Sequence, residues 1–222
     1  MDSISQTEEN YLKAIFKISE KEDKPASTNA ISTEIQTSAA SVTDMLKRLS
    51  EKELLHYEKY KGVTLTDKGN QIATELIRKH RLWEVFLVDK LDFSWDEVHE
   101  MAEQLEHIKS KELVERLDEF LGKPKFDPHG DPIPDANGNF TFRKQVLLAD
   151  MAPGNEGVVV GVQDHTTAFL QYLDRLELVL GVAIKVLERF EYDESVKILL
   201  KGQKEQILSK KVCQNLFVQK RT

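Results

Sequence analysis

A proline- and glycine-rich stretch divides this 222-residue chain into two parts of different character. Residues 122–139, GKPKFDPHGDPIPDANGN, hold all but two of the six prolines, a composition that predicts turns and irregular structure. The residues before this stretch show helical periodicity, whereas those after it form β-branched segments separated by turns. The chain is therefore predicted to be mainly α with a small β domain, and it is long enough for two or three modules.

Residues 1–65 show the order of elements that is typical of a winged helix-turn-helix. A capping box at Ser5 and Glu8 predicts the start of the first helix, and apolar residues at helical spacing predict two short helices after it. Residues 54–65 have a strand-like pattern with a hairpin tip. A hairpin directly after two tightly connected helices indicates a wing.

Helices are also predicted in residues 66–121. One runs from Thr66 to about Asp89, and a second capping box starts another at Ser94, which continues to about Lys109. Leucines at four-residue spacing mark a further helix. Residues 146–222 contain the segments EGVVVGV, VAIKVL and SVKILL, with TTAFLQYLDRL as a short helical insert, and are predicted to form a small SH3-like β-barrel.

Histidine and glutamate gather on two of the predicted helices. On the second of them, two histidines and two glutamates project from one face because they are spaced at i, i+4, i+7 and i+8: His99, Glu103, Glu106 and His107. The preceding helix adds His80 and Glu84, four residues apart. Such a stripe is typical either of a metal site or of the solvated face of an amphipathic helix.

Imidazole and carboxylate ligands suit Mn(II), Fe(II) or Zn(II), because Mn(II) accepts hard oxygen ligands and the later metals favour imidazole. The chain has one cysteine, Cys213, so a thiolate cluster is excluded, and we expect a small buried hydrophobe there. The Glu-x-x-His motif of carboxylate-bridged di-metal centres does not occur, since a histidine follows Glu103 by four residues and Glu106 by one. This spacing argues against an oxidase.

The helix SAASVTDMLKRL is predicted to be the recognition helix of the helix-turn-helix. Its apolar stripe faces the core, so the other side chains are predicted to face the DNA groove: Ser38, Ala40, Ser41, Thr43, Asp44 and Lys47. On the wing, Lys59, Tyr60 and Lys61 are predicted to contact the DNA backbone. A less common alternative is a winged helix that binds protein instead.

Charge and hydropathy restrict the partners of the chain. Its net charge of −7 argues mildly against nucleic-acid binding, but the acidic excess is concentrated in residues 66–121, where metal ligands are predicted. No run of about 18 apolar residues occurs, and the N-terminus lacks the pattern of a secretory signal. We therefore expect a cytoplasmic protein with no membrane partner.

Six segments, taken in order, resemble the diphtheria-toxin-repressor (DtxR) family of iron- and manganese-dependent repressors: TEENYLKAIF, ASVTDMLKRL, YEKYKGVTLTDKG, KHRLWEVFL, WDEVHEMAEQLEH and PHGDPIP. The tail from ADMAPGNEGVVVGV to VAIKVL similarly resembles the FeoA-like SH3 barrel that many members append. The resemblance implies a winged helix-turn-helix domain at 1–65, a helical metal-binding and dimerisation domain at 66–135, and a barrel domain at 146–222.

The resemblance also implies two groups of metal ligands. One group, which in the family also uses the first helix, matches Glu103, Glu106 and His107. The other group matches His80, Glu84 and His99. The first-helix ligand matches Asn10, or Glu9 if the register shifts by one, and Lys13 stands where members with a paired manganese site place a glutamate. Residues of the barrel are candidates for further ligands: Gln163, Asp164 and His165.

Glu103 stands where iron-sensing members have a cysteine, and a hard carboxylate there favours Mn(II), with Fe(II) next and Zn(II) also compatible. The implied function is a metal-dependent repressor of metal-uptake genes that binds a palindromic operator as a homodimer. We hypothesise a population shift in which clustered carboxylates repel one another without metal, and a bound cation ties the first helix to them.

Two other classes of function compete with a repressor. One is a metal-binding protein or metal-dependent hydrolase that does not bind DNA, and the other is a regulator that senses a different ligand. A hydrolase needs an open coordination position and a nearby base, and the sequence specifies neither.

Overall fold

The computed structural model describes residues 4–58 and 61–221, which form two compact units. The first unit consists of Met1–His80, Glu103–Val114 and Pro134–Phe140, and the second consists of Arg81–Ala102, Glu115–Ile133 and Thr141–Thr222. The predicted middle domain is therefore shared between the units, and its boundaries stay a prediction. Helices followed by a small antiparallel sheet confirm the predicted fold class.

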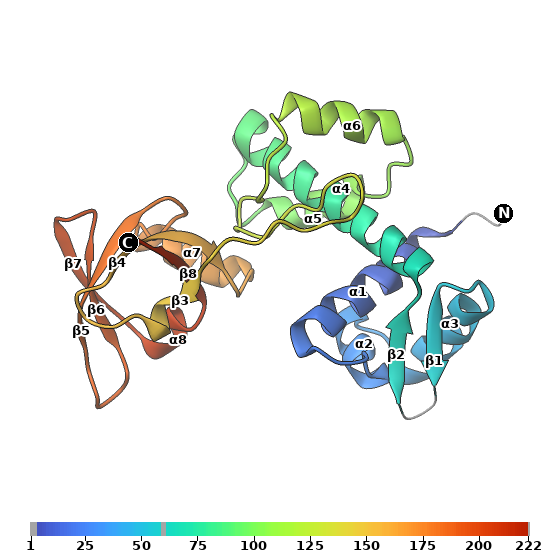
Figure 1. Cartoon of the computed structure of the whole chain (residues 1–222), viewed down its shortest axis with the longest axis horizontal. Coiled ribbons are helices and arrows are strands. Elements are labelled where there is room, and N and C mark those ends of the chain that lie inside the picture. Colours follow the sequence, from blue (N-terminus) through green and yellow to red (C-terminus); the bar gives the residue numbers. More distant parts are fainter. Residues whose placement is uncertain (1–3, 59–60, 222) are drawn as a thin grey trace. The chain divides into compact units, whose positions relative to one another are not determined.

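The first unit contains a winged helix-turn-helix, drawn at the blue end of the chain in Figure 1. It has three helices and a hairpin: α1 (Gln6–Glu22), α2 (Thr28–Ile35), α3 (Ala39–Glu51), β1 (Leu55–Glu58) and β2 (Gly62–Leu65). The strands pair antiparallel, with Leu55 opposite Leu65. Because α1 contacts α2 and β2, and α3 contacts α2 and β1, the predicted motif and its wing are confirmed.

Serine side chains fix where these three helices begin. Ser5 and Glu8 form the predicted capping box, in which the Glu8 amide donates to Ser5 Oγ and the Ser5 amide donates to the Glu8 carboxylate. Ser27 and Ser38 accept hydrogen bonds from backbone amides three residues on and cap α2 and α3. Each cap fixes the start of its helix, and the spacing of the apolar residues then gives one buried stripe per helix.

One apolar core holds the winged helix-turn-helix together. Its fully buried side chains come from all three helices: Leu12 and Ile15 of α1, Ile31 of α2, and Leu46 and Leu49 of α3. Burying a side chain of this size stabilises the fold by about 1.5–3 kcal/mol. Because α3 turns its apolar stripe into this core, its opposite face is exposed.

Glu8 also links α1 to the end of α3, because Lys52 Nζ lies 2.7 Å from its carboxylate. Burial raises the pKa of Glu8, but hydrogen bonds from Lys52 and Ser5 outweigh this effect and hold the pKa below its ordinary value of 4.5. A lowered folded-state pKa stabilises the fold above the unfolded-state value, and this stability is lost as the pH falls through the folded-state pKa.

We expect Glu8→Gln to lower the free energy of unfolding by about 1 kcal/mol near neutral pH, because it removes a charge-assisted hydrogen bond. The difference from the unmodified chain should shrink as the pH falls below 4.5 and through the lowered folded-state pKa of Glu8, because the carboxylate then becomes protonated. Thermal unfolding followed by circular dichroism measures both, with the exposed Glu34→Gln as control. A difference that is equally large at low pH would contradict this role for Glu8.

The long helix α4 (Asp67–Leu91) begins in the first unit and continues into the second. Thr66 caps it as predicted, through a hydrogen bond from the Gly69 amide to Thr66 Oγ1. The helix ends two residues beyond the predicted end at Asp89. Among the described residues, no helix is both long enough and apolar enough to cross a membrane.

The helix α5 (Val98–Leu105) is shorter at both ends than predicted. The hydrogen bonds from Ser94 to Glu97 are present, but residues 95–97 form a turn before the helix. At the other end, the Ile108 amide donates to the carbonyl of Leu105, a tight turn that closes the helix before the predicted end at Lys109. The next helix, α6 (Lys111–Phe120), follows after five residues without helix or strand, 106–110.

The second unit contains the predicted β domain, drawn in orange and red in Figure 1. Its strands are β3 (Val146–Leu147), β4 (Glu156–Val162), β5 (Ala183–Arg189), β6 (Val196–Leu200), β7 (Lys204–Leu208) and β8 (Leu216–Lys220). They pair antiparallel in the order β3-β8-β4-β5-β6-β7. The predicted helical insert is present as α7 (Thr167–Arg175), and shorter helical segments are η1 (Leu148–Asp150) and α8 (Lys210–Cys213).

Within the second unit, the β domain is joined to the residues around α5. Trp95 is buried among the apolar side chains of the β domain, and its Nε1 donates to the Asp174 carboxylate of α7 at 3.1 Å. The proline-rich segment contacts β4, because the Val162 amide donates to the carbonyl of His129 and Arg143 bridges the carbonyls of Gly130 and Val160. The β domain therefore supports the loop that carries His129.

Candidate metal centre

A cluster of acidic, basic and imidazole side chains lies in the first unit, where α1 meets the end of α5. Lys13 Nζ lies 2.6 Å from Glu103 Oε1 and 2.6 Å from Glu106 Oε1. Glu106 has no exposed surface, and Lys13 is only 6% exposed. Two carboxylates therefore hold one positive charge away from solvent, an arrangement that is stable only when the charges are paired.

Two histidines complete this cluster. His80 Nδ1 lies 2.6 Å from Glu106 Oε2, and His107 Nδ1 lies 2.7 Å from Glu9 Oε2. The second nitrogen of His107 faces Glu106, with Nε2 at 3.8 Å from Oε1. Three carboxylates and two imidazoles are thus brought together from α1, α4 and the end of α5, and we call this group the Glu/His cluster.

The Glu/His cluster fits a divalent cation for three reasons. Its oxygens already surround a positively charged group, the Lys13 ammonium. Carboxylate oxygens and imidazole nitrogens are ligands that Mn(II) and Fe(II) accept. On α1, Asn10 Oδ1 is buried and has no hydrogen-bond partner among the described residues, so this oxygen is available to a cation.

Some of the predicted metal ligands lie in a different element of secondary structure than expected. Glu106 and His107 lie in the turn after α5, not on the helix with His99 and Glu103, because the helix closes at Leu105. The Glu106 carboxylate is buried in this turn, whereas the sequence pattern had predicted Glu106 as the third position of a helical stripe. His80 of α4 contacts Glu106. The resemblance had assigned these two residues to different groups of ligands.

A second group of ligand atoms lies in the second unit. Glu84 Oε2 is 3.6 Å from His129 Nδ1, and Glu84 Oε1 is 3.5 Å from His99 Nδ1. One ligand atom from each of Glu84, Asp127 and His129 lies within 4.8 Å of the others, and all three residues are buried. We call these three residues the Asp/His cluster, with His99 at its exposed side.

The charges of the Asp/His cluster act strongly on one another. Burial raises the pKa of Asp127, and the negative charges of Asp131 and Glu84 raise it further, to about 7. Burial lowers the pKa of His129, but its interaction with Glu84 and the charge of Asp127 raise it to about 9. Carboxylates that repel one another in a buried site gain from a nearby cation, so this cluster also suits a metal ion.

Asp127 and His129 were not among the residues predicted from the sequence to bind metal. They belong to the irregular segment DPHGD, where no helical or strand periodicity shows which side chains face inward. The sequence feature that could have indicated a metal site here was a histidine between two aspartates in that segment. The imidazole of His165, a predicted barrel candidate, stacks on His129 at 4.9 Å between ring centroids. Of the other barrel candidates, Gln163 is exposed and Asp164 Oδ1 accepts the Thr166 amide.

The predicted DNA-facing residues of α3 lie on its outer side. Thr43 is half-buried, and the other five are exposed: Ser38, Ala40, Ser41, Asp44 and Lys47. Ser38 Oγ caps the helix and also lies 2.9 Å from Ser41 Oγ. Thr43 Oγ1 donates to the carbonyl of Ala39, so its hydroxyl is engaged within the helix.

Basic side chains on this surface are held only by weak ion pairs. Lys47 Nζ lies 3.6 Å from Asp44 Oδ1, and on the wing Lys61 Nζ lies 2.7 Å from Glu58 Oε2. All four side chains are more than half exposed, so these pairs contribute little and leave the lysines able to turn to a phosphate. The other two predicted wing residues, Lys59 and Tyr60, lie outside the described residues.

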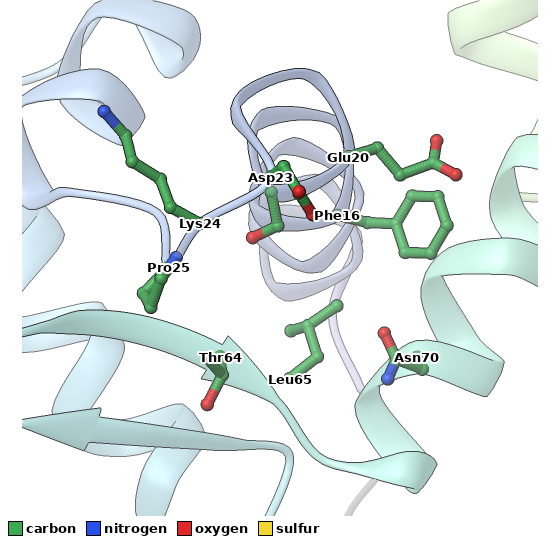
Figure 2. A pocket seen from close by; sticks show the side chains of 9 residues that line it. Phe16, Glu20, Asp23, Lys24, Pro25, Thr64, Leu65 and Asn70 are labelled. Carbon is green, nitrogen blue, oxygen red and sulfur yellow. The ribbon is translucent and has the colours of Figure 1, made fainter.

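A pocket also opens in the first unit, between the end of α1, β2 and the start of α4 (Figure 2). Phe16 and Glu20 of α1 project towards the start of α4, where Asn70 lies. No residue of the Glu/His cluster lines this pocket. Cys213 is buried as predicted, and burial raises the pKa of its thiol to about 11, so we assign it no reactive role.

Family models match three consecutive parts of the chain. They are the N-terminal DNA binding domain of iron dependent repressors over residues 3–63, the metal binding and dimerisation domain of iron dependent repressors over residues 66–135, and the FeoA domain over residues 146–220. Among curated proteins, the iron-dependent repressor IdeR of Mycobacterium leprae (strain TN) is 34% identical over 186 residues. That alignment covers 80% of this chain and 80% of the relative.

Solved structures of manganese-dependent repressors are similar over nearly the whole chain. A manganese-dependent transcriptional repressor in complex with manganese has a TM-score of 0.85 and 33% identity, covering 96% of this chain and 100% of that one. The repressor ScaR with bound Zn²⁺ has a TM-score of 0.75 and 36% identity, covering 96% of this chain and 99% of that one.

Proposed function

Because this chain belongs to the iron-dependent repressor family of metal-dependent transcriptional repressors, we propose that a divalent ion in its Glu/His cluster switches its binding to operator DNA. The chain is a transcriptional regulator and not an enzyme. The observation that carries the proposal is that Glu103 and Glu106 share a single buried positive charge, while two imidazoles face Glu106.

The donor set favours Mn(II), with Fe(II) next and Zn(II) also compatible. Glu103 and Glu106 supply carboxylate oxygens, His107 supplies a ring nitrogen, and α1 supplies Glu9 or Asn10. Hard oxygens outnumber nitrogens in this set, which suits Mn(II) better than the later metals. In the second unit, Glu84, His99, Asp127 and His129 form a further candidate site, whereas His80 belongs to the Glu/His cluster.

These residues connect the DNA-binding part of the chain to its metal ligands. Glu9 and Lys13 lie on α1 and reach His107, Glu103 and Glu106, while α1 also contacts α2 and β2. A divalent ion held here would add two positive charges for Glu9, Glu103 and Glu106 to share. Residues of α1 that bind the ion would fix the position of the helix-turn-helix. Metal binding would thereby raise the fraction of chains in the DNA-binding arrangement.

We propose that the chain binds a palindromic operator as a homodimer. Two copies related by a two-fold axis would place their α3 helices in successive major grooves, about 34 Å apart or a multiple of this distance. In the second unit, Leu91 and Phe120 are more than half exposed, and Phe120 lies beside Phe86 with Lys90 over its ring. An exposed apolar surface of this kind is typical of a protein interface, and we place the dimer contact there.

The DNA contacts predicted on α3 and the wing are Ser38, Ala40, Ser41, Thr43, Asp44, Lys47, Lys59, Tyr60 and Lys61. Small hydroxyl side chains allow α3 to approach base edges closely, and the lysines neutralise phosphates. We expect the target genes to be those of metal uptake, and we expect the chain to act in the cytoplasm.

Lys47→Ala tests the DNA contact. We expect weaker operator binding and a slope of log affinity against log salt that is smaller by about one unit, because one phosphate contact is lost. The operator is a duplex selected from a random pool in the presence of Mn(II), and fluorescence anisotropy measures its binding at several salt concentrations. The exposed lysine of β8 provides the control Lys220→Ala, for which the slope should not change.

The same duplex tests the class of function. Anisotropy should rise with Mn(II) present and return to the free value when the metal is chelated. A chain that selects no duplex from the pool with Mn(II), Fe(II) or Zn(II) would instead be a metal-binding protein without a DNA target.

A further inference from the structure

Lys13 is an unusual occupant of a predicted metal site. It lies on α1 between buried apolar residues, and its ammonium bridges Glu103 and Glu106 at 2.6 Å from each. These are two of the carboxylates that a divalent ion would use. The chain thus carries a positive charge of its own at the place where its cofactor would bind.

The position of this ammonium opposes metal binding. Each carboxylate oxygen that accepts a hydrogen bond from Lys13 must share or give up that contact when it ligates a cation. If the ammonium stays nearby, two positive charges face each other in a partly desolvated site, where charge repulsion is stronger than in water. Both outcomes weaken the affinity of the cluster for a divalent ion.

The same ammonium favours assembly of the metal-free cluster. Glu106 is fully buried, and a buried carboxylate without a positive partner is strongly unfavourable. Lys13 therefore supplies this partner from α1 to the turn after α5. This contact limits the carboxylate repulsion that the sequence had led us to expect in the metal-free state.

We propose that Lys13 is a competing cation built into the sensor, which raises the concentration of divalent metal needed to fill the Glu/His cluster. The inference rests on the proposed function, since it takes this cluster as the metal site. A purely structural ion pair has a different consequence: its loss would disorder the carboxylates and weaken metal binding.

Calorimetric titration of the whole chain with Mn(II) tests the inference. We expect Lys13→Met to bind Mn(II) at least tenfold more tightly than the unmodified chain, and to unfold at a lower temperature without metal. Lys13→Gln, which keeps a polar group but no charge, should show the same gain in affinity if the methionine variant folds poorly. Equal or weaker Mn(II) binding in a folded variant, judged by circular dichroism, would overturn the proposal.

A matched control is another lysine, which pairs with a glutamate of α1. Lys52 Nζ also pairs with a mostly buried glutamate of α1, Glu8, but neither residue belongs to the Glu/His cluster. We expect Lys52→Met to lower the unfolding temperature without changing the affinity for Mn(II). A gain in affinity in Lys52→Met as large as in Lys13→Met would overturn the inference, because the effect would then follow from any lost ion pair.

The double variant Lys13→Met with Glu106→Gln separates this inference from the site assignment. If Glu106→Gln alone leaves Mn(II) binding unchanged, the assigned site is wrong and the proposed function fails with it. If Glu106→Gln weakens binding but Lys13→Met does not strengthen it, only the inference fails. We expect the tenfold gain from Lys13→Met to be lost in the double variant, because the two residues contact each other.

Discussion

Glu106→Gln should raise the Mn(II) concentration needed for operator binding by at least about a hundredfold. The Glu106 carboxylate is fully buried and central to the cluster, with one oxygen facing Lys13 and His107 and the other facing His80. Glutamine keeps the shape of the side chain but replaces a charged oxygen ligand with a weak amide oxygen. Anisotropy of a labelled operator duplex, titrated with Mn(II), measures the shift.

A matched control for this variant is Glu100→Gln, an exposed glutamate on α5 itself. It changes the net charge equally but should leave the Mn(II) titration unchanged. His107→Ala removes a ligand while keeping the contacts of Lys13 with Glu103 and Glu106, and should show a similarly large shift. If both Glu106→Gln and His107→Ala need the same Mn(II) concentration for operator binding as the unmodified chain, the Glu/His cluster is not the metal site.

Gly130→Ala should cause the largest loss of stability that we predict, about 3 kcal/mol or more. Gly130 has a φ of +92°, in the left-handed region that L side chains rarely adopt. A Cβ there would lie 2.1 Å from the carbonyl oxygen of Val160 and 2.5 Å from the Cα of Gly161. Both are backbone atoms of β4, so neither can move aside without disturbing the sheet.

This loss should be visible as a fall of roughly 6–12 °C in the unfolding temperature. Gly154→Ala separates the two causes, because Gly154 has a similar φ of +87° but no atom within 4 Å of the added Cβ. It should cost only about 1 kcal/mol, from the backbone conformation alone. Equal losses in both variants would contradict the close packing of the proline-rich segment against β4.

Much of the fold follows from local rules that the sequence displays. The capping box at Ser5 predicted the start of α1 correctly, whereas the one at Ser94 placed the start of α5 too early. Apolar spacing predicted the helix-turn-helix, and a strand-like pattern predicted its wing. The end of α5 was wrong because the helical spacing of ligand residues continues past Leu105, whereas the backbone turns there. The helical spacing of ligand residues can thus continue beyond the end of a helix, since a tight turn can also place its side chains on the same side as those of the helix.

The candidate site was less predictable than the fold. Glu9 and Lys13 of α1 were connected with the site only through the family resemblance, and no spacing pattern in the sequence pointed to them. In the structure Glu9 contacts His107 and Lys13 contacts Glu103 and Glu106, because α1 packs against the end of α5. Contacts between residues about ninety positions apart depend on tertiary packing, which no local pattern reports.

The Asp/His cluster was also predicted only in part from the sequence. Glu84 was identified because it lies four residues from His80 on a predicted helix. Asp127 and His129 lie in an irregular segment whose inward side depends on its hydrogen bonds, including those of Asp127 Oδ1 with the amides of His129 and Asp131. The residues that periodicity can find are therefore only part of the ligand set.

A divalent ion should bind where α1 meets the end of α5, and anomalous diffraction tests this most directly. Crystals of the chain grown with Mn(II), measured at the manganese absorption edge, should give a strong anomalous peak in coordination distance of Glu103, Glu106 and His107. Peaks found only elsewhere in the chain, at full Mn(II) saturation, would contradict the account.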